Sequence, residues 1–400
     1  MQKKTILDLL NTAGFLLLLA VLLLSAVLRE KETYSYYENR NLASAPTASV
    51  EGILDGSYFS AAETCLADHA PGRRTALKLR TFTDLHILRR PVVNDTVIVR
   101  DEHLLLPFTE HEYDAGTLNP SMIADCAGMI ADNLRVHADA VESYGGYFCY
   151  AAVPCQYVCY EDAYPDYLNN RRTYTERSTA ALFAELDAHD IPYIDLRAVY
   201  ETGEDLRESS STVDNHYSIS GAFMLYREIV GLINRDTDLA MDVPREEDFV
   251  LTVRENPYMG SRIRKLCGLW ESGERLGLME PAEKIPFTRY NGGKAAEAAV
   301  YSLPYNRWEP LLYNVYMGGD IAECRIDTER QELPSILVYG DSFTNALECV
   351  LWTGFDEMYS YDFRYYKERP LDEIIAEYQP EVVVCVRDYQ AILNLTGNGI

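Results

Sequence analysis

Residues 336–347 read ILVYGDSFTNAL, and this short stretch holds a strand, a turn and the start of a helix. The apolar and aromatic residues 336–339 predict a buried strand, and the Gly-Asp-Ser that follows is typical of a turn. Apolar residues then recur at helical spacing over 343–352. Ser342 therefore stands where a strand ends and a helix begins, and the N–H groups at a helix start favour negative charge.

Two roles fit a serine at this junction. An acyl-transfer oxyanion needs N–H donors of this kind, so Ser342 could be a nucleophile at the C-terminal end of the strand. Asp and Ser are also good N-caps, so Ser342 could instead only stabilise the helix. A histidine within reach of its hydroxyl would favour the first role.

Strands and helices alternate along much of the chain. We expect a buried strand over 145–154, a helix over 174–189 and a short strand over 191–196. The same order returns over 335–386, which predicts three parallel strands with two helices between them. We therefore expect an α/β fold with one parallel sheet flanked by helices. Residues 236–333 lose this alternation and are rich in Pro, Gly and Tyr, which predicts an irregular insertion or lid.

The N-terminal segment is strongly apolar. An almost unbroken apolar run over 13–28 follows Lys3 and Lys4, and the longer segment over 6–28 is about long enough to span a bilayer. We expect an uncleaved transmembrane helix with its N-terminus in the cytoplasm, because lysines favour that side. A cleaved signal peptide is the alternative. The sequence thus predicts a membrane-anchored, single-pass protein with the bulk of the chain extracytoplasmic.

These patterns divide the chain into five parts. The predicted parts are a cytoplasmic tip and transmembrane anchor (1–32), a stalk and N-terminal segment (33–90), the first part of the α/β domain (91–235), the insertion or lid (236–333) and the second part of the α/β domain (334–400).

The composition limits the partners of the protein. Its formal net charge is −26, which argues against binding to nucleic acid or to an anionic lipid surface, because no basic stripe is present to neutralise phosphates. The thirty tyrosines are a high number. Exposed tyrosines can stack on sugars, although many tyrosines belong to protein cores.

The cysteines fit no common metal site. The chain has nine, an odd number, so at least one is unpaired. Cys149, Cys155 and Cys159 lie close together in the sequence, but their spacing matches no usual zinc pattern. We expect buried thiols, with one local disulfide as the alternative.

One of the seven histidines differs from the others. His216 lies two residues after Asp214 in a polar loop that opens a helix. In an Asp-x-His loop the carboxylate can reach the nearer ring nitrogen, fix the tautomer and leave the other nitrogen for a serine. With Ser342 this gives an orienting acid, a base and a nucleophile, although spacing alone does not show that they meet. A metal site is the weaker alternative, because no third ligand has matching spacing.

Several stretches together resemble the DHHW family. They are YYENRNLASAPTAS, DNHYS, YMGGD, ILVYGDSFTNAL and PEVVVCVRD. The DHHW proteins are relatives of the alginate O-acetyltransferase group within the SGNH hydrolase-like superfamily. The resemblance runs from about Tyr34 to the C-terminus and is weak from about 240 to 310. It implies an SGNH-hydrolase-like sheet with a circularly permuted motif order, in which Ser342 is the nucleophile, His216 the base and Asp214 its orienter.

The sequence also departs from the family pattern. The name-giving Asp-His-His-Trp reads DNHY over 214–217, which keeps the acid and the base, and Tyr217 keeps an aromatic wall. The usual SGNH oxyanion residues, a Gly and an Asn, are not evident, and Arg364 and Arg387 hold the corresponding positions. These arginines could bind an oxyanion or the carboxylate of an acidic sugar, or they could be surface or ion-pair residues.

The resemblance implies an extracytoplasmic O-acetyltransferase that acts on a cell-surface or secreted polysaccharide through an acyl-serine at Ser342. It implies no metal or nucleotide cofactor, and a membrane-bound O-acyltransferase as the partner that supplies the acetyl group. Two alternatives stay open. A carbohydrate acetyl esterase would use the same triad with water as acceptor, and a non-catalytic polysaccharide-binding module would leave the triad idle.

Overall fold

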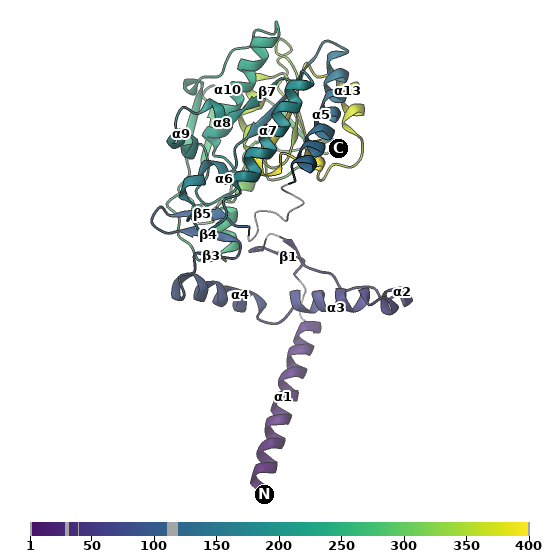
Figure 1. The fold of residues 1–400 in the computed structure, drawn as a ribbon, viewed down its shortest axis with the longest axis vertical. Coiled ribbons are helices and arrows are strands. Elements are labelled where there is room, and N and C mark those ends of the chain that lie inside the picture. The colour runs from purple at the N-terminus through teal and green to yellow at the C-terminus, as the bar shows by residue number, and fades with distance from the viewer. Residues whose placement is uncertain (1, 29–31, 39, 110–118, 399–400) are drawn as a thin grey trace. The chain divides into compact units, whose positions relative to one another are not determined.

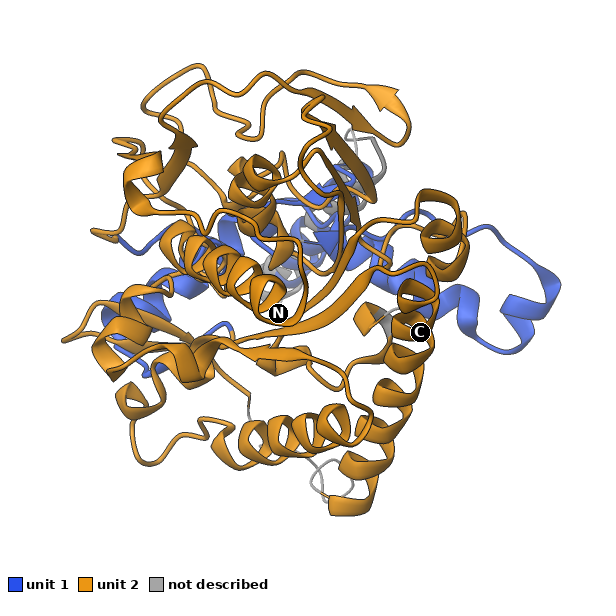
Figure 2. Cartoon of the chain, turned by 90° about the horizontal axis from the view of Figure 1, so that it is seen from above, with its two compact units in different colours: residues 1–94, 263–271 blue, residues 95–262, 272–400 orange. Residues whose placement is uncertain are grey.

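The computed structural model describes residues 2–28, 32–38, 40–109 and 119–398 (Figure 1). The chain forms two compact units, coloured separately in Figure 2: unit 1 comprises 1–94 with 263–271, and unit 2 comprises 95–262 with 272–400. The five-part division drawn from the sequence stays a prediction.

Unit 1 contains one long helix, several shorter helices and short strands. Its helices and strands are α1 (Gln2–Leu28), β1 (Tyr34–Ser35), β2 (Arg40–Asn41), α2 (Val50–Leu54), α3 (Ser57–Asp68), α4 (Arg73–Phe82) and β3 (Val92–Val93). A further helix, α11 (Ser261–Lys265), begins in unit 2 and ends in unit 1. Gly56 and Gly72 precede α3 and α4 with φ of 84° and 75°, a left-handed conformation that favours glycine.

The prediction of a membrane anchor is contradicted. Among the residues that the structure describes, no helix has the length and the apolar character that crossing a membrane requires. Residues 6–28 do lie in a helix, but Asp8 and Asn11 interrupt its first turns. The unbroken apolar run over 13–28 is shorter than the roughly 20 residues that a span needs. The predicted single-pass localisation is therefore wrong.

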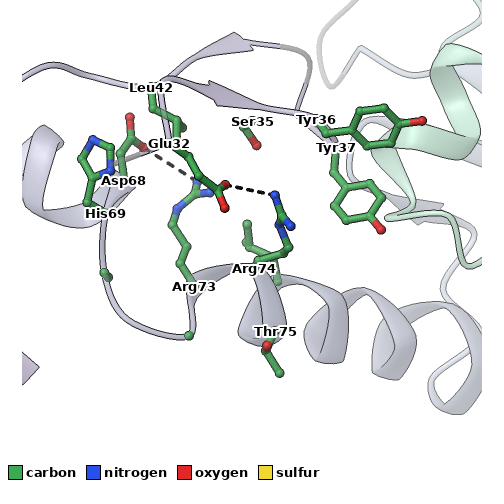
Figure 3. Close-up of a pocket in the computed structure, with 13 residues that line it drawn as sticks. Glu32, Ser35, Tyr36, Tyr37, Leu42, Asp68, His69, Arg73, Arg74 and Thr75 are labelled. Atoms are coloured by element: carbon green, nitrogen blue, oxygen red, sulfur yellow. Dashed lines mark hydrogen bonds and ion pairs between the residues drawn. The ribbon is translucent and has the colours of Figure 1, made fainter. Parts of the chain in front are cut away.

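A pocket of about 190 Å³ within unit 1 is lined in part by ion-paired side chains (Figure 3). Arg74 lies 3.0 Å from the Glu32 carboxylate. Arg73 lies 2.5 Å from Glu38, and this hydrogen bond lowers the pKa of Glu38 to about 2. Because these arginines already have carboxylate partners, the network stabilises unit 1 and does not present free cations to a ligand.

The centre of unit 2 is a mixed sheet, with eight strands among the described residues. Across the sheet they are β11 (Lys294–Ala295), β10 (Thr288–Asn291), β12 (Glu323–Asp327), β14 (Glu357–Tyr361), β13 (Ile336–Gly340), β15 (Val382–Asp388), β6 (Tyr147–Val153) and β7 (Tyr193–Asp195). The strands from β14 to β7 are parallel, which confirms the predictions for 335–386 and for the earlier strands.

The expectation of a wholly parallel sheet is wrong. Strands β10, β11 and β12 are antiparallel and come from the predicted insertion, residues 236–333. Buried and half-buried residues alternate along β12, as in antiparallel strands covered on one face. The insertion is therefore partly an edge of the main sheet. Within unit 2, two smaller antiparallel pairs join β4 (Thr96–Val99) to β5 (Leu104–Pro107) and β8 (Phe249–Val253) to β9 (Gly277–Pro281).

Helices cover both faces of the main sheet (Figure 1). The helices of unit 2 are α5 (Pro120–Glu142), α6 (Gln156–Cys159), α7 (Arg172–Ala188), α8 (Leu196–Val199), α9 (Gly203–Glu208), α10 (Ile219–Asp236), α12 (Thr344–Leu351) and α13 (Leu371–Tyr378). Helix α5 packs with α7 and α13, and α10 packs on α12. The chain steps from β13 to β14 and back across β13 to β15. Because such crossovers are right-handed, α12 and α13 lie on opposite faces.

Strand β13 lies at a reversal in the order of the strands. Its neighbours β14 and β15 follow it in the chain but lie on opposite sides of it. Every residue of β13 and β15 is buried, as in parallel strands covered on both faces. Ligands of α/β proteins bind beyond the carboxyl ends of strands at such a reversal. Ser342 stands two residues past the end of β13.

All nine cysteines carry free thiols. Eight are buried and Cys126 is half-buried, which confirms the expectation of buried thiols. The alternative of a local disulfide among Cys149, Cys155 and Cys159 is not realised. Within the described ranges, no group of three or more His, Cys, Asp or Glu residues is placed to hold a metal ion.

Candidate active site

The turn between β13 and α12 presents Ser342. A Cβ at Gly340 would lie 2.2 Å from the Val386 carbonyl oxygen in β15, so the close approach of the two strands requires glycine. The Asp341 carboxylate accepts the N–H of Phe343 at 3.0 Å. Asp341 thus holds the turn before α12, and the Ser342 hydroxyl has a different partner.

The structure brings the three predicted triad residues together. Ser342 Oγ lies 2.8 Å from His216 Nε2, and Asp214 Oδ1 lies 2.6 Å from His216 Nδ1. Because an ionised carboxylate only accepts hydrogen bonds, Nδ1 carries the proton of the neutral ring and Nε2 accepts from the serine. The predicted meeting of His216 and Ser342, which are 126 positions apart, is confirmed.

The Asp214 carboxylate is buried and held from two segments. Its Oδ1 also accepts the N–H of His216 at 3.2 Å, and its Oδ2 accepts the N–H of Ser261 at 2.5 Å. A Cβ at Gly260 would lie 2.4 Å from the Val213 carbonyl oxygen, so glycine allows this approach. Burial opposes ionisation, but the charge and hydrogen bonds of His216 and the Ser261 N–H outweigh it and lower the pKa of Asp214 to about 2.

Tyr313 fixes the plane of the histidine ring. The two rings are stacked, with centroids 3.6 Å apart and planes 5° from parallel. The Tyr313 hydroxyl donates to the carbonyl oxygen of Ser342 at 3.0 Å, so one side chain contacts both the base and the nucleophile's backbone. Sequence reasoning missed Tyr313 and Ser261, which lie in the segment expected to be a lid. The position of Tyr313 just before YMGGD, one of the family-like stretches, was the available signal.

A second carboxylate, that of the half-buried Glu274, holds the loop that carries Asp214. Glu274 accepts the N–H of Thr212 and the hydroxyl of Ser211, each at 2.7 Å, and it also accepts the Thr212 hydroxyl. Ser211 Oγ in turn accepts the N–H of Asp214 at 2.9 Å. Burial raises the pKa of Glu274 above its ordinary value. No pattern in the sequence marks Glu274, a single acid in an irregular segment.

Tyr217 packs beneath the nucleophile. Its side chain is buried, and its hydroxyl donates to the Phe343 carbonyl oxygen at 2.6 Å. The Tyr217 and Phe343 rings lie 5.5 Å apart. Tyr217 lines a separate cavity of about 180 Å³, which Tyr313 also lines. The aromatic wall expected from the sequence is therefore a support of the Ser342 turn, placed away from the cavity at the serine.

Arg387 forms an ion pair inside the protein. Its side chain is 2% exposed, with Nη1 2.8 Å from Asp341 Oδ2 and Nη2 donating to the Ala391 carbonyl oxygen at 3.0 Å. A Cβ at Gly397 would lie 1.6 Å from Nη1, so the guanidinium fills the space that a side chain there would need. Of the roles considered from the sequence, the structure shows the ion pair. Arg387 steadies Asp341 and through it the turn that carries Ser342.

Arg364 is also paired with carboxylates. Its Nε lies 2.9 Å from Asp362 Oδ1 and its Nη2 lies 2.6 Å from Asp362 Oδ2, a two-point contact. The same Nη2 lies 3.2 Å from Asp320 Oδ2. Asp320 Oδ1 accepts the Asn345 side-chain amide at 3.0 Å. Both predicted arginines therefore reach the site already bound to acidic residues of the chain.

A cavity of about 450 Å³ adjoins Ser342. Its charged lining comprises Asp341, Arg364, Arg387 and Asp388, the last residue of β15. Asp388 is 7% exposed. Burial and the charge of Asp341 raise the pKa of Asp388 to about 7, and Arg387 offsets this only in part. The size of the cavity lies within the range of small-ligand sites.

The family model that matches the chain is described as DHHW protein, and the match covers residues 38–119. The predicted resemblance to the DHHW family is confirmed. The matched residues precede the triad, so this match by itself assigns no role to Ser342 or His216. No curated protein matches the chain.

The solved structures similar to this chain include the following two. PatB1 of Bacillus cereus, solved with a sulfonyl adduct, is 19% identical with a TM-score of 0.59, and the match covers 74% of this chain and 94% of PatB1. A DHHW family protein from Eubacterium siraeum DSM 15702 is 15% identical with a TM-score of 0.56, covering 77% of this chain and 95% of that protein. At such identities the likeness shows the fold alone, an α/β fold with a large mixed sheet.

Proposed function

We propose that the protein is a serine O-acetyltransferase that places an acetyl group on a hydroxyl of a polysaccharide. One observation carries the proposal. Ser342, His216 and Asp214 form a continuous chain of hydrogen bonds beside a cavity at the reversal of the sheet. The fold shared with PatB1 and with the DHHW family protein of E. siraeum supports it at the level of architecture.

The first half-reaction acetylates the serine. His216 Nε2 takes the proton of Ser342 Oγ as that oxygen attacks the carbonyl carbon of an acetyl ester. The N–H of Ser342 is proposed to stabilise the resulting oxyanion. The bond to the donor's alkoxide oxygen then breaks, and His216 returns the proton to this leaving group. The products are acetyl-Ser342 and the donor alcohol.

The second half-reaction transfers the acetyl group. A sugar hydroxyl attacks the acyl carbon while His216 Nε2 takes its proton. Collapse of the oxyanion breaks the bond to Ser342 Oγ, which recovers the proton from His216. Asp214 stays ionised throughout and stabilises the imidazolium that forms twice in each cycle, since its pKa of about 2 keeps the carboxylate charged near neutral pH.

The acetyl donor is part of the proposal, and the family likeness implies a membrane-bound O-acyltransferase. An acetyl esterase would use the same first half-reaction and then water in place of the sugar. A purely sugar-binding module has less support, because it would have no use for a hydrogen-bonded acid, base and serine.

Acetylation of the full-length chain tests the proposal. Incubation with p-nitrophenyl acetate should release nitrophenol and leave one acetyl group on Ser342, located by peptide mass spectrometry. A polysaccharide added to the acetylated protein should gain acetyl groups faster than free acetate appears. Release of acetate alone would instead make the protein an esterase.

A matched serine variant controls for non-specific acetylation. Ser342→Ala should lose the acetyl group and the turnover, whereas Ser143→Ala, which removes an exposed hydroxyl at the end of α5, should keep both. Turnover by Ser342→Ala at the wild-type rate would refute the acyl-serine.

A further inference from the structure

We infer that the sugar unit accepting the acetyl group carries no carboxylate, and that Asp320 enforces this selection as the second carboxylate, beside Asp362, on Arg364. The inference rests on the proposed function, because it concerns the acceptor of acetyl-Ser342. It names a substrate class, the uncharged sugars, and a residue that sets specificity without contacting the reacting atoms.

The charges around the cavity are the first support. Arg364 and Arg387 are the cations of its described lining. Each is held by a carboxylate of the chain, at 2.6 Å from Asp362 and 2.8 Å from Asp341. A carboxylate on the sugar would have to displace one of these partners, and a displaced carboxylate would be left unpaired in a mostly buried place.

The carboxylates at the cavity and on its arginines outnumber those arginines. Asp388 lines the cavity directly, whereas Asp320 contacts Arg364 at 3.2 Å without lining the cavity. Against two arginines the described site thus sets four acids, Asp320, Asp341, Asp362 and Asp388. Burial and the charge of Asp341 already raise the pKa of Asp388, so this cavity opposes a further anion.

The uncharged part of the lining suits sugar hydroxyls. Asn215 and Gln390 offer amide groups, and Phe343 offers an apolar face. The buried Asp388 carboxyl can exchange hydrogen bonds with a hydroxyl at little electrostatic cost. A neutral sugar therefore meets donors, acceptors and an apolar surface without introducing a charge.

Asp320 owes its position to the backbone before it. Gly318 and Gly319 have φ of 86° and 102°, values that favour glycine, and they bring the YMGGD stretch to the site. The Asn345 amide then holds Asp320 Oδ1, which leaves Oδ2 facing Arg364 at 3.2 Å. An asparagine at 320 could keep the bond with Asn345 through its own oxygen while releasing Arg364 from a negative partner.

The test compares two acceptors that differ only in the C6 group, methyl β-glucoside and methyl β-glucuronide. Each is added to full-length protein acetylated at Ser342, and loss of the acetyl group and formation of the acetylated glycoside are followed by mass spectrometry. The glucoside should accelerate deacetylation at least about tenfold more than the glucuronide. Equal rates with the two glycosides, a faster rate with the glucuronide, or no acceleration by either glycoside would overturn the inference. None of these results would contradict acetylation of Ser342. Failure to acetylate Ser342 at all would overturn the proposed function, and the inference with it.

Two variants and one control sharpen the test. Asp320→Asn should lower the glucoside-to-glucuronide rate ratio by about three- to tenfold, because Arg364 then keeps one carboxylate partner, Asp362, in place of two. Asp388→Asn removes a different carboxylate of the same cavity and should act in the same direction if Asp320→Asn fails to fold. Asp132→Asn makes the same change in net charge at an exposed site on α5, and it should leave the glucoside-to-glucuronide rate ratio unchanged. If both cavity variants keep the wild-type glucoside-to-glucuronide rate ratio, Asp320 and Asp388 do not select against charged sugars.

Discussion

The nucleophile and its base are held by two regions of very different construction. Ser342 follows a strand that is buried at every residue and hydrogen-bonded on both sides, and α12 begins two residues after Ser342. His216 lies in a loop without regular structure of its own. Its position depends on Asp214, Tyr313 and, through the loop, Glu274.

This difference shows that residues 236–333, the predicted insertion, help to position the catalytic residues. The backbone of β13 is fixed by repeated hydrogen bonds, so no single side chain decides where Ser342 lies. The loop over 211–216 is fixed by a few individual contacts, several of which come from residues 236–333. Side-chain substitutions in that insertion should therefore weaken catalysis while leaving the main sheet intact.

The largest expected effect tests the regular region. Ser342→Ala should lower turnover of an acetyl ester by about 10⁵- to 10⁶-fold, because no other described group replaces the hydroxyl that faces His216. Its free energy of unfolding should fall by no more than about 1 kcal/mol, since Asp341 and not Ser342 accepts the N–H of Phe343. Urea unfolding followed by circular dichroism would measure this, and a loss of several kcal/mol would show that the serine is structural.

The second-largest expected effect tests the loop over 211–216, which carries Asp214 and His216. Asp214→Asn should lower turnover by about 10³- to 10⁴-fold, because the amide no longer enforces the tautomer with its proton on Nδ1. Steady-state kinetics should show the loss in kcat. A variant that stays folded and retains near wild-type kcat would break the proposed division of roles between Asp214 and His216.

Tyr313 tests whether the insertion supports the base. Tyr313→Leu removes the ring stacked on His216 and should lower kcat about 10- to 100-fold, since a small displacement of a catalytic group costs about that much. Tyr313→Phe keeps the stack, loses only the bond to Ser342, and should cost less than about fivefold. Equal losses in the two variants would show that the stack is unimportant.

Glu274 should give a smaller effect of the same kind. Glu274→Gln turns one acceptor into a donor opposite the Thr212 N–H or the Ser211 hydroxyl, and should lower kcat about three- to tenfold with KM little changed. Glu280→Gln, at an exposed position of β9, is the matched control. A drop in KM alone, or an equal effect of the control, would remove Glu274 from the framework.

The last effect concerns stability instead of turnover and returns to the regular region. The pKa of Asp388 is raised in the folded protein above the ordinary value of an unfolded aspartate, so its ionisation as pH rises from about 4 to about 7 destabilises the folded state. Asp388→Asn cannot ionise. Its stability relative to wild type should therefore rise by about 1 to 3 kcal/mol between about pH 5 and pH 8, as measured by urea midpoints. A constant difference across this range would contradict the raised pKa.

The same contrast explains what could be read from the sequence. The strand, turn and helix around Ser342 are adjacent in the chain, and so are Asp214 and His216, so local patterns were enough to predict them. Tyr313 and Glu274 act across long sequence separations from an irregular segment, where no periodicity marks a residue.

The errors have physical causes of the same kind. Arg387 looked available for substrate because its partner Asp341 is distant in the chain. Strands β10 and β12 are short and partly polar, so their antiparallel pairing left no clear alternation in the sequence. The membrane anchor was inferred from the length of the apolar segment and the lysines before it, although Asp8 and Asn11 in the first turns of α1 shorten the apolar run.

Alkylation of the buried thiols would report on local unfolding of the protein. Burial raises the pKa of Cys159 and Cys385 to about 12 and also raises that of Cys149, so these sulfurs stay protonated and shielded from alkylating reagents while the sheet is closed. Cys126 is the half-buried exception. Iodoacetamide should therefore label the folded chain mainly at Cys126, and labelling of Cys149 or Cys385 would time the opening of β6 and β15 without any engineered probe.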